Sequence, residues 1–342
     1  MAFTTQKHLI VYVKTTETCN LNCAHCFTSG INGRKIYFDA DKTAKWCNEL
    51  DDGSNHIHFE YHGGEPLLAP MKDLWHFYNI TKDHWGDKCT HGITTNLTYK
   101  LTDERVEFLK VLDSGSIGTS WDPNIRFANE KQRQLWENNV KRLVSEGCNI
   151  QCFISVSKDV VAMEPLEIAD YMHSLGVGSI NYERLTHDGN ATINPDIFPH
   201  NSELDAFWMK MHETTKDHPI ENNFLNSVYD KFSKGQFFNG TFCRDCEQKI
   251  HTINADGTVA GCPNTAPTQW YGDISMPAKT VRESPKRMEV IACETHERDP
   301  RCYDCPVFIY CHSDCHQLQW MEDVCPAPKT LMMKLAGDKG WI

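Results

Sequence analysis

The sequence has no long hydrophobic stretch and no apolar segment at its N-terminus. A membrane-spanning helix needs roughly 18 or more consecutive apolar residues, and residues 1–8 lack the apolar core of a secretory signal. We therefore expect a cytoplasmic protein without a membrane partner. Its thiols are then kept reduced, so clustered cysteines are expected to bind metal rather than to form disulfides.

Basic residues are fewer than acidic ones. The 342 residues include 34 Lys and Arg against 46 Asp and Glu, which gives a net charge of −12. This balance argues against a broad positive surface for nucleic-acid phosphates, although it permits a local basic cleft. Low-complexity segments and long internal repeats are also lacking. With 40% hydrophobic residues, the chain is long enough for one large domain or two ordinary ones.

Cysteine, by contrast, is abundant. Three of the 16 cysteines form a C-x3-C-x2-C motif at Cys19, Cys23 and Cys26, directly after the apolar run at 9–13. Thiolates are soft ligands for iron–sulfur clusters and zinc. Three of them on one short loop can hold three irons of a four-iron cluster and leave the fourth iron open. Taken alone, the motif also fits a zinc site or a redox-active cysteine pair.

Short apolar segments and amphipathic segments alternate in the first half of the chain. Such alternation is typical of βαβ units around a parallel sheet. Six repeats predict an α/β fold, a partial (β/α)6 TIM-like barrel, with functional residues at the C-terminal ends of the strands. The expected strands are 9–13, 56–62, 92–96, 116–120, 149–156 and 179–185, and the expected helices are 39–50, 70–84, 102–112, 132–145, 165–175 and, later, 203–216.

Polar motifs follow three of these expected strands. Two adjacent glycines let a backbone approach a ligand closely, and a carboxylate beside them can pair with an ammonium group. Since parallel strands end at one edge, these residues are expected to form one site. They are Gly63, Gly64 and Glu65 after the second strand, Thr95 and Asn96 after the third, and Ser120 and Asp122 after the fourth.

Titratable side chains are expected in the mouth of the barrel. His58, Glu60 and His62 share one face of the second strand, and burying them is costly unless they serve a ligand. His62, nearest the mouth, is the candidate for substrate contact. Glu183 or Arg184 on the sixth strand is the candidate for binding a polar end of the substrate. A solvated face on the second strand and an internal ion pair on the sixth are the alternatives.

The C-terminal third is again rich in cysteine. Nine cysteines lie between residues 243 and 325, and Asp256-Gly257 marks a hairpin turn within 252–259. So dense a set is expected to depend on metal for its folding, with zinc sites as the alternative to iron–sulfur clusters. Five cysteines outside the motifs are expected to be small buried side chains: Cys47, Cys89, Cys148, Cys152 and Cys293.

On these motifs, residues 9–330 resemble the radical SAM (S-adenosylmethionine) enzymes, and in particular their SPASM-domain subfamily. The resemblance implies that Cys19, Cys23 and Cys26 hold a [4Fe–4S] cluster whose open iron takes the amino and carboxylate groups of SAM. It also implies two auxiliary [4Fe–4S] clusters, three clusters in all. The first would be held by Cys243, Cys246, Cys262 and Cys315, and the second by Cys302, Cys305, Cys311 and Cys325.

The same resemblance implies a SAM pocket. His25 stands where the family usually has an aromatic residue near the adenine, and Gly63-Gly64-Glu65 matches the motif that binds the amino group. Arg133 is the candidate partner of the SAM carboxylate, with Arg126 as its rival. Residues implied to contact the ribose or the methionine part are Thr95, Asn96, Ser120 and Asp122.

The resemblance further implies three parts. These are a radical SAM partial barrel at 1–185, a connector at 186–240 that covers the active site, and a SPASM domain at 241–342. An external one-electron reductant of the flavodoxin or ferredoxin type would drive cleavage of SAM, and the resulting radical would abstract hydrogen from a substrate carbon. The outcome is open between an oxidoreductase and an isomerase reaction.

A peptide or protein residue is the expected substrate. The alternative is radical rearrangement or modification of a small molecule or nucleobase, such as an amino-acid-decorated base of modified DNA. Pro263 and Asn264 follow Cys262 where sulfatase-maturing relatives carry Asp, which argues against that particular activity. A non-catalytic iron–sulfur electron carrier is disfavoured, because a carrier has no use for a SAM pocket.

Overall fold

Six parallel strands follow one another in chain order. The computed structural model describes residues 8–28, 30–50, 56–234, 244–264 and 269–342. A parallel bridge from Thr94 to Gly118 joins the sheet of the first three strands to that of the next three. The expected α/β fold with parallel strands is confirmed, and closure into a partial barrel stays a prediction. The strands are β1 (His8–Thr16), β2 (His56–Gly63), β3 (Cys89–Ile93), β4 (Ser116–Ser120), β5 (Asn149–Val156) and β6 (Ser179–Arg184).

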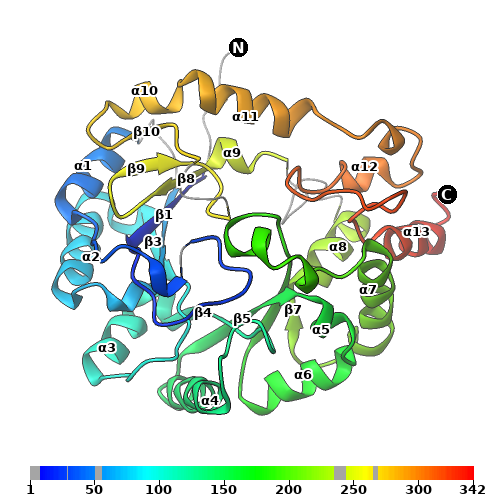
Figure 1. Ribbon diagram of the computed structural model, residues 1–342, viewed down its shortest axis with the longest axis horizontal. Helices are drawn as coiled ribbons and strands as arrows, with labels where there is room; N and C mark the ends of the chain where they lie inside the picture. The colour runs from blue at the N-terminus through cyan, green and yellow to red at the C-terminus, as the bar shows by residue number, and fades with distance from the viewer. Residues whose placement is uncertain (1–7, 29, 51–55, 235–243, 265–268) are drawn as a thin grey trace.

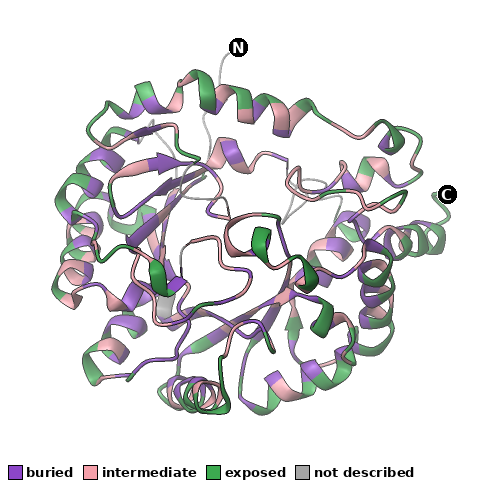
Figure 2. Cartoon of the chain, viewed as in Figure 1, coloured by how far each residue is buried: buried purple, intermediate pink, exposed green. Residues whose placement is uncertain are grey.

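Helices lie around the outside of these strands (Figure 1). Alternate residues of each strand are buried against them: Phe59 and Tyr61 of β2 are fully buried, and Phe59 meets the ring of Phe77 edge-on at 5.4 Å. Figure 2 shows exposed residues mainly on the outer sides of the helices. The helices of this part are α1 (Ala40–Leu50), α2 (Met71–Trp85), α3 (Asp103–Val111), α4 (Glu130–Ser145), α5 (Lys158–Val161) and α6 (Pro165–Ser174).

The third strand ends earlier than the sequence predicted. β3 ends at Ile93 rather than at residue 96. The N–H of Thr94 still donates to the carbonyl of Tyr61, but the N–H of Thr95 donates to Gly118 of β4 at 2.9 Å. The backbone therefore stops pairing with β2 after Thr94 and pairs with β4 at Thr95. Thr95 and Asn96 consequently lie just beyond the strand end, among the other functional candidates.

The cysteine-rich part adds strands to the sheet of β1. β8 (Ile250–Ile253) runs parallel to β1, and β9 (Thr258–Ala260) returns antiparallel, followed by β10 (Gly272–Asp273). This confirms the hairpin expected around Asp256-Gly257, where Gly257 has a φ of +87°. The sequence did not predict that the hairpin would pair with the first strand, where it covers an edge that would otherwise be exposed.

The segment after β6 is mostly helical in its described residues. α7 (Asn201–Thr215) confirms the helix expected at 203–216, and residues 235–243 lie outside the described residues. The three-part division at residues 185 and 240 stays a prediction. No helix in the described ranges has the length and apolarity to span a membrane. The remaining elements are β7 (Glu221–Asn222), α8 (Asn223–Ser233), α9 (Cys246–Lys249), α10 (Ala278–Arg282), α11 (Pro285–His296), α12 (Phe308–Cys311) and α13 (Lys329–Asp338).

A buried ion pair joins β6 to the cysteine-rich part. The guanidinium of Arg184 pairs with Asp314, and only 3% and 1% of these side chains are exposed. Nη2 of Arg184 donates to Oδ1 of Asp314 at 2.8 Å. Asp314 lies between Cys311 and Cys315 with a positive φ of +57°. Because each charge is stable in the interior only while its partner is present, the pair fixes the cysteine segment onto the strand.

Removing the arginine is expected to destabilise the fold strongly. In Arg184→Met, the Asp314 carboxylate stays buried without its partner, which costs about 3–5 kcal/mol of unfolding free energy. Anaerobic urea unfolding measures this loss. The control is Arg142→Met, whose partner Asp103 is 93% exposed, and its effect is expected to stay below about 1 kcal/mol. Equal losses in both variants would contradict the prediction.

Candidate functional site

The loop that carries Cys19, Cys23 and Cys26 leaves the C-terminal end of β1. The N–H of Cys26 donates to the carbonyl of Cys23 at 3.2 Å, and the N–H of Leu21 donates to Cys19 Sγ at 3.4 Å. Burial raises the pKa of Cys19 to about 12 and that of Cys23 to about 11, and neighbouring thiols of the loop add to both shifts. Cys23 is buried and Cys19 and Cys26 are partly buried, and a bound metal would stabilise the thiolate forms of these cysteines.

The end of β2 lies directly against this loop. The N–H groups of Gly64 and Glu65 donate to the carbonyls of Thr16 and Thr18, both at 2.8 Å. A Cβ at Gly63 would lie 2.3 Å from the Thr16 oxygen, and a Cβ at Gly64 would lie 2.3 Å from the Thr18 oxygen. Both glycines are thus explained by the contact between two chain segments, before any ligand is taken into account.

Glu65 is fully buried and bound within the chain. Its Oε1 accepts hydrogen bonds from the N–H of Leu67 at 3.1 Å and from Thr95 Oγ1 at 2.7 Å, and its Oε2 accepts one from the N–H of Asn96 at 2.8 Å. Burial raises the pKa of Glu65 to about 7, although these bonds oppose the shift. A carboxylate has about four acceptor positions, so one position remains on Oε2 for the ammonium group of a ligand.

Asn96 connects the third strand to the cysteine loop. Its Nδ2 donates to Asn20 Oδ1 at 2.9 Å and reaches Cys19 Sγ at 3.8 Å. Its Oδ1 accepts from the N–H of Thr98 at 2.8 Å, which fixes the amide orientation. The structure thereby brings together the motifs after the second and third strands and the first cysteine of the loop.

A charged cluster lies on another side of the loop. Asp122 Oδ2 accepts from Arg126 Nε, and its Oδ1 accepts from the N–H of Ser155, both at 2.5 Å. Burial alone would raise the pKa of Asp122, but Arg126 and then His25 outweigh it and lower the pKa. Burial lowers the pKa of His25 to about 4, against the pull of Asp122. His25 Nδ1 is buried without a hydrogen-bond partner among the described residues, so a ligand can bind there.

The two arginine candidates have different surroundings. Arg133 lies on α4, where it pairs with Glu130 and Glu137 and 39% of its side chain is exposed. Arg126 is 13% exposed; burial would lower its pKa, but Asp122 and then Cys23 outweigh burial and raise the pKa. Arg126 is therefore the candidate that the structure places beside the loop. Ser120 ends β4 with 9% of its surface exposed.

His58, Glu60 and His62 share one face of β2, as the two-residue period predicted, and the residues between them are buried. His58 Nε2 and Glu60 Oε2 are 3.2 Å apart. The ring of His62, at the strand end, meets Tyr12 edge-on, and its Nδ1 is buried without a partner. Burial, and then the charge of Lys14, lowers the pKa of His62 to about 3.

Lys14 and Tyr12 face the same interior, although their sequence context carries no motif. Lys14 lies beside His62 in the strand register, and Tyr12 lies beside Glu60. Lys14 is 4% exposed, and burial lowers its pKa to about 8 while Cys262 and Cys26 oppose the shift. Extending the two-residue period of β1 to residue 14 would have predicted this placement.

Glu183 and Arg184 of β6 have different partners. Arg184 is held by Asp314, as the alternative of an internal ion pair anticipated. Among the described residues, Glu183 Oε1 accepts one long hydrogen bond, at 3.4 Å, from Asn181. Burial, and then the charge of Asp122, raises the pKa of Glu183 to about 7. Of the two residues, Glu183 is the one whose side chain can still accept a substrate group.

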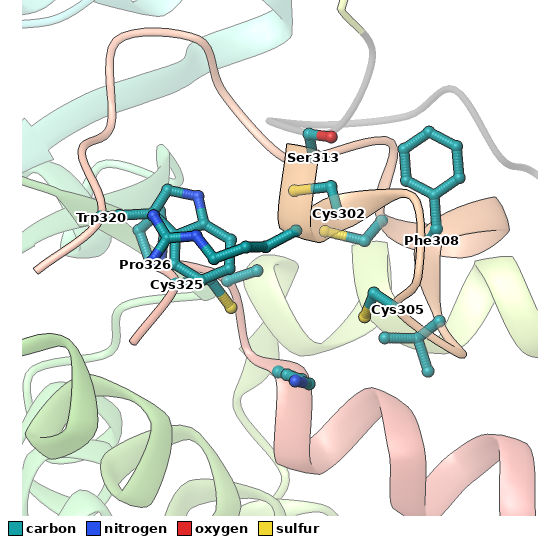
Figure 3. A pocket seen from close by; sticks show the side chains of 12 residues that line it. Cys302, Cys305, Phe308, Ser313, Trp320, Cys325 and Pro326 are labelled. Atoms are coloured by element: carbon teal, nitrogen blue, oxygen red, sulfur yellow. The ribbon is translucent and has the colours of Figure 1, made fainter. Parts of the chain in front are cut away.

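Four C-terminal cysteines line one cavity (Figure 3). Figure 3 shows Cys302, Cys305 and Cys325 around the same space, with Phe308 and Trp320 at its sides. Cys311 lines it too. These four are the predicted ligands of the second auxiliary cluster, and a set of four thiols around one cavity fits a [4Fe–4S] cluster.

The first auxiliary cluster has three of its predicted ligands in the described residues: Cys246, Cys262 and Cys315. Cys243 lies outside them. Burial raises the pKa of Cys262, and the nearby Cys315 adds to the shift. Within the described ranges, no three Cys, His, Asp or Glu side chains are arranged to hold a single metal ion. A cubane cluster places each thiolate on a different iron, so its ligands do not meet at one point.

The cysteines outside the motifs mostly behave as expected. Cys47, Cys89, Cys148 and Cys152 are buried, whereas Cys293 on α11 is partly exposed. Its position on the outer part of a helix, beside Glu297, explains the difference.

Comparison with known proteins identifies the fold. No protein-family model matches the chain. A stretch of 118 residues is 36% identical to the uncharacterised protein MJ0907 of Methanocaldococcus jannaschii and covers 34% of this chain. The match spans 38% of that relative's length, well under two thirds of it.

Solved structures match over nearly the whole chain. Native anSMEcpe with bound AdoMet (SAM) has a TM-score of 0.79 at 16% identity, over 97% of both chains. SuiB of Streptococcus suis bound to the precursor peptide SuiA has a TM-score of 0.63 at 14% identity, over 93% of this chain and 76% of SuiB. The chain has the fold of these radical SAM enzymes. anSMEcpe has also been solved with AdoMet and the Cp18Cys peptide, with a TM-score of 0.79 at 16% identity and 97% coverage of both chains.

Adding one methyl group at the contact between β2 and the loop is expected to destabilise the site. In Gly64→Ala, the Cβ would meet the carbonyl oxygens of residues 17 and 18, which costs about 1–3 kcal/mol of unfolding free energy. Gly337→Ala on α13 is the control, because nothing lies within 4 Å of its added Cβ and a helix gains roughly 1 kcal/mol from Ala over Gly. Urea unfolding at the same midpoint in both variants would contradict the prediction.

Proposed function

We propose that this chain is a radical SAM enzyme that modifies a residue of a peptide or protein. The observation that carries the proposal is the meeting of the C-x3-C-x2-C loop with Glu65, Asn96 and Asp122 at the ends of three parallel strands. Cys19, Cys23 and Cys26 would hold a [4Fe–4S] cluster, which would supply the electron for reductive cleavage of SAM and so for hydrogen abstraction from a substrate carbon. Side chains of the protein bind SAM, orient the substrate and exclude water.

The SAM pocket is formed by residues around the loop. Glu65 Oε2 accepts a hydrogen bond from the amino group of SAM, with Gly63 and Gly64 letting the strand end approach. Arg126, beside the loop, takes the carboxylate in the role for which Arg133 was the first candidate. His25 offers its unpartnered Nδ1 toward the adenine. Residues proposed to line the remaining pocket are Thr95, Asn96, Ser120 and Asp122.

The substrate is proposed to bind between β2 and β6. His62 offers a ring nitrogen without a partner among the described residues, and Glu183 offers a carboxylate with one long hydrogen bond there. Polar groups of the substrate that bind them would hold its reacting carbon in place. A peptide substrate is supported by the fold shared with anSMEcpe and SuiB, both solved with peptides.

The C-terminal cysteines are proposed to hold the two auxiliary clusters. The sets are Cys243, Cys246, Cys262 and Cys315 for the first, and Cys302, Cys305, Cys311 and Cys325 for the second. An external one-electron reductant of the flavodoxin or ferredoxin type is the proposed source of the first electron. The partial barrel, the connector and the SPASM domain are proposed as the three functional parts.

Iron content and SAM cleavage together test the proposal. Three four-iron clusters predict about 12 irons per chain after anaerobic reconstitution, with deoxyadenosine released from SAM under reducing conditions. Cys19→Ala is expected to lose about 4 irons and to release no deoxyadenosine. Cys293→Ala, outside both cysteine motifs, is the control and retains both properties. Deoxyadenosine release by Cys19→Ala would refute the role of the loop.

Loss of the Glu65 charge is expected to weaken SAM binding. Glu65→Gln preserves the side-chain shape but places an amide near the ammonium group, so the Kd for SAM is expected to rise about tenfold or more, about 1.4 kcal/mol. Equilibrium dialysis on the reconstituted enzyme measures this change. Glu104→Gln on the exposed side of α3 is the matched control. An unchanged Kd in Glu65→Gln would remove Glu65 from the SAM pocket.

A further inference from the structure

Two buried glutamates lie beside the predicted ligands of the first auxiliary cluster. Glu247 follows Cys246 on α9, and Glu294 lies on α11; each is 1% exposed. In the described part of the chain, neither carboxylate lies within ion-pair distance of a lysine or an arginine. Burying a carboxylate without a cation is costly, so its hydrogen bonds must compensate.

Both carboxylates bind backbone N–H groups of cysteine ligands. Glu294 Oε1 accepts from the N–H of Cys246, and its Oε2 accepts from the N–H of Glu247, both at 3.0 Å. Glu247 Oε1 accepts from the N–H of Cys262 at 3.1 Å, and its Oε2 accepts from Tyr271 Oη at 2.8 Å. A chain of hydrogen bonds thus runs from α11 through α9 to the segment after β9, and it orients two cysteines from opposite sides of the hairpin.

The neighbouring backbone is adapted to this arrangement. A Cβ at Gly261 would lie 1.6 Å from Glu247 Oε2, so the carboxylate occupies the space of a side chain at that position. Arg287, although buried nearby, donates to the carbonyls of Glu247 and Arg282 rather than to a carboxylate. His316 Nδ1 lies 3.8 Å from Glu294 Oε1, but burial lowers the pKa of His316 to about 4, so the ring is neutral.

The hydrogen bonds of a ligand's N–H group affect an iron–sulfur cluster directly. Hydrogen bonds to the cluster sulfurs and less negative surroundings both raise its reduction potential. Here the N–H groups of Cys246 and Cys262 donate to the carboxyl oxygens of Glu294 and Glu247 instead, and in their ionised form these carboxyl groups add negative charge. Both effects lower the potential of any cluster held by these cysteines.

We propose that Glu247 and Glu294 are positioning residues that orient Cys246 and Cys262 and keep the reduction potential of the first auxiliary cluster low. The inference rests on the proposed function, because it requires that cluster. A low potential keeps the cluster oxidised at rest, so that only a strongly reducing donor, such as a substrate carbon radical, can give it an electron.

The test is an anaerobic redox titration of the reconstituted full-length protein, followed by EPR. Wild type is compared with Glu247→Gln and Glu294→Gln, and Cys262→Ala identifies the signal of the first auxiliary cluster by its loss. In both glutamine variants, this signal is expected at a more positive potential, while the other two clusters stay unchanged and serve as internal references. Glu289→Gln removes the same charge from the exposed side of α11 and is the matched control.

The outcomes separate the inference from the proposed function. Wild-type protein with zinc or without an auxiliary signal would overturn the proposed function. A normal wild type, with glutamine variants that titrate like Glu289→Gln, would overturn only the inference. If Glu294→Gln retains no cluster, the Glu247→Gln titration decides, because that variant leaves both hydrogen bonds to Glu294 in place.

Discussion

The site depends on the close approach of two backbones, those of Gly63-Gly64 and of residues 16–18. Only glycine fits at this contact, and its two hydrogen bonds, both 2.8 Å long, set the distance between the end of β2 and the start of the cysteine loop. From there, Glu65 reaches Thr95 and Asn96, and Asn96 reaches Cys19. These contacts therefore fix the position of Cys19 relative to the end of β2.

Burial of charge determines which side chains remain able to bind a ligand. Asp122 is compensated by Arg126 and by a backbone N–H, and Arg184 is compensated by Asp314. Such groups are stable as they stand, and removing either partner is costly. His62 and Glu183 are partly buried and have few partners among the described residues. They lie at the ends of β2 and β6, where we propose that the substrate binds.

Local patterns predicted most of the strands and helices because alternation, glycines and helix-capping residues act over short distances. The third strand was placed three residues late, because the transfer of Thr95 from β2 to β4 is a contact between strands rather than a local signal. The choice between Arg133 and Arg126 had a local clue, since Asp122 and Arg126 are spaced as an i,i+4 pair. The interior position of Lys14 was not predicted, because this residue follows the apolar run at 9–13. A charged residue at such a point ordinarily indicates the end of a buried strand.

The sequence by itself determined the C-x3-C-x2-C loop, because three cysteines within eight residues are brought together by the chain itself, and it determined most of the parallel strands, because their periodicity is local. It could not decide which charges are compensated. Arg184 and Asp314 are 130 residues apart, and the N–H of Cys246 donates to Glu294, 48 residues further along the chain. Only the tertiary structure brings such groups into contact. Burial then makes the loss of either partner costly in free energy.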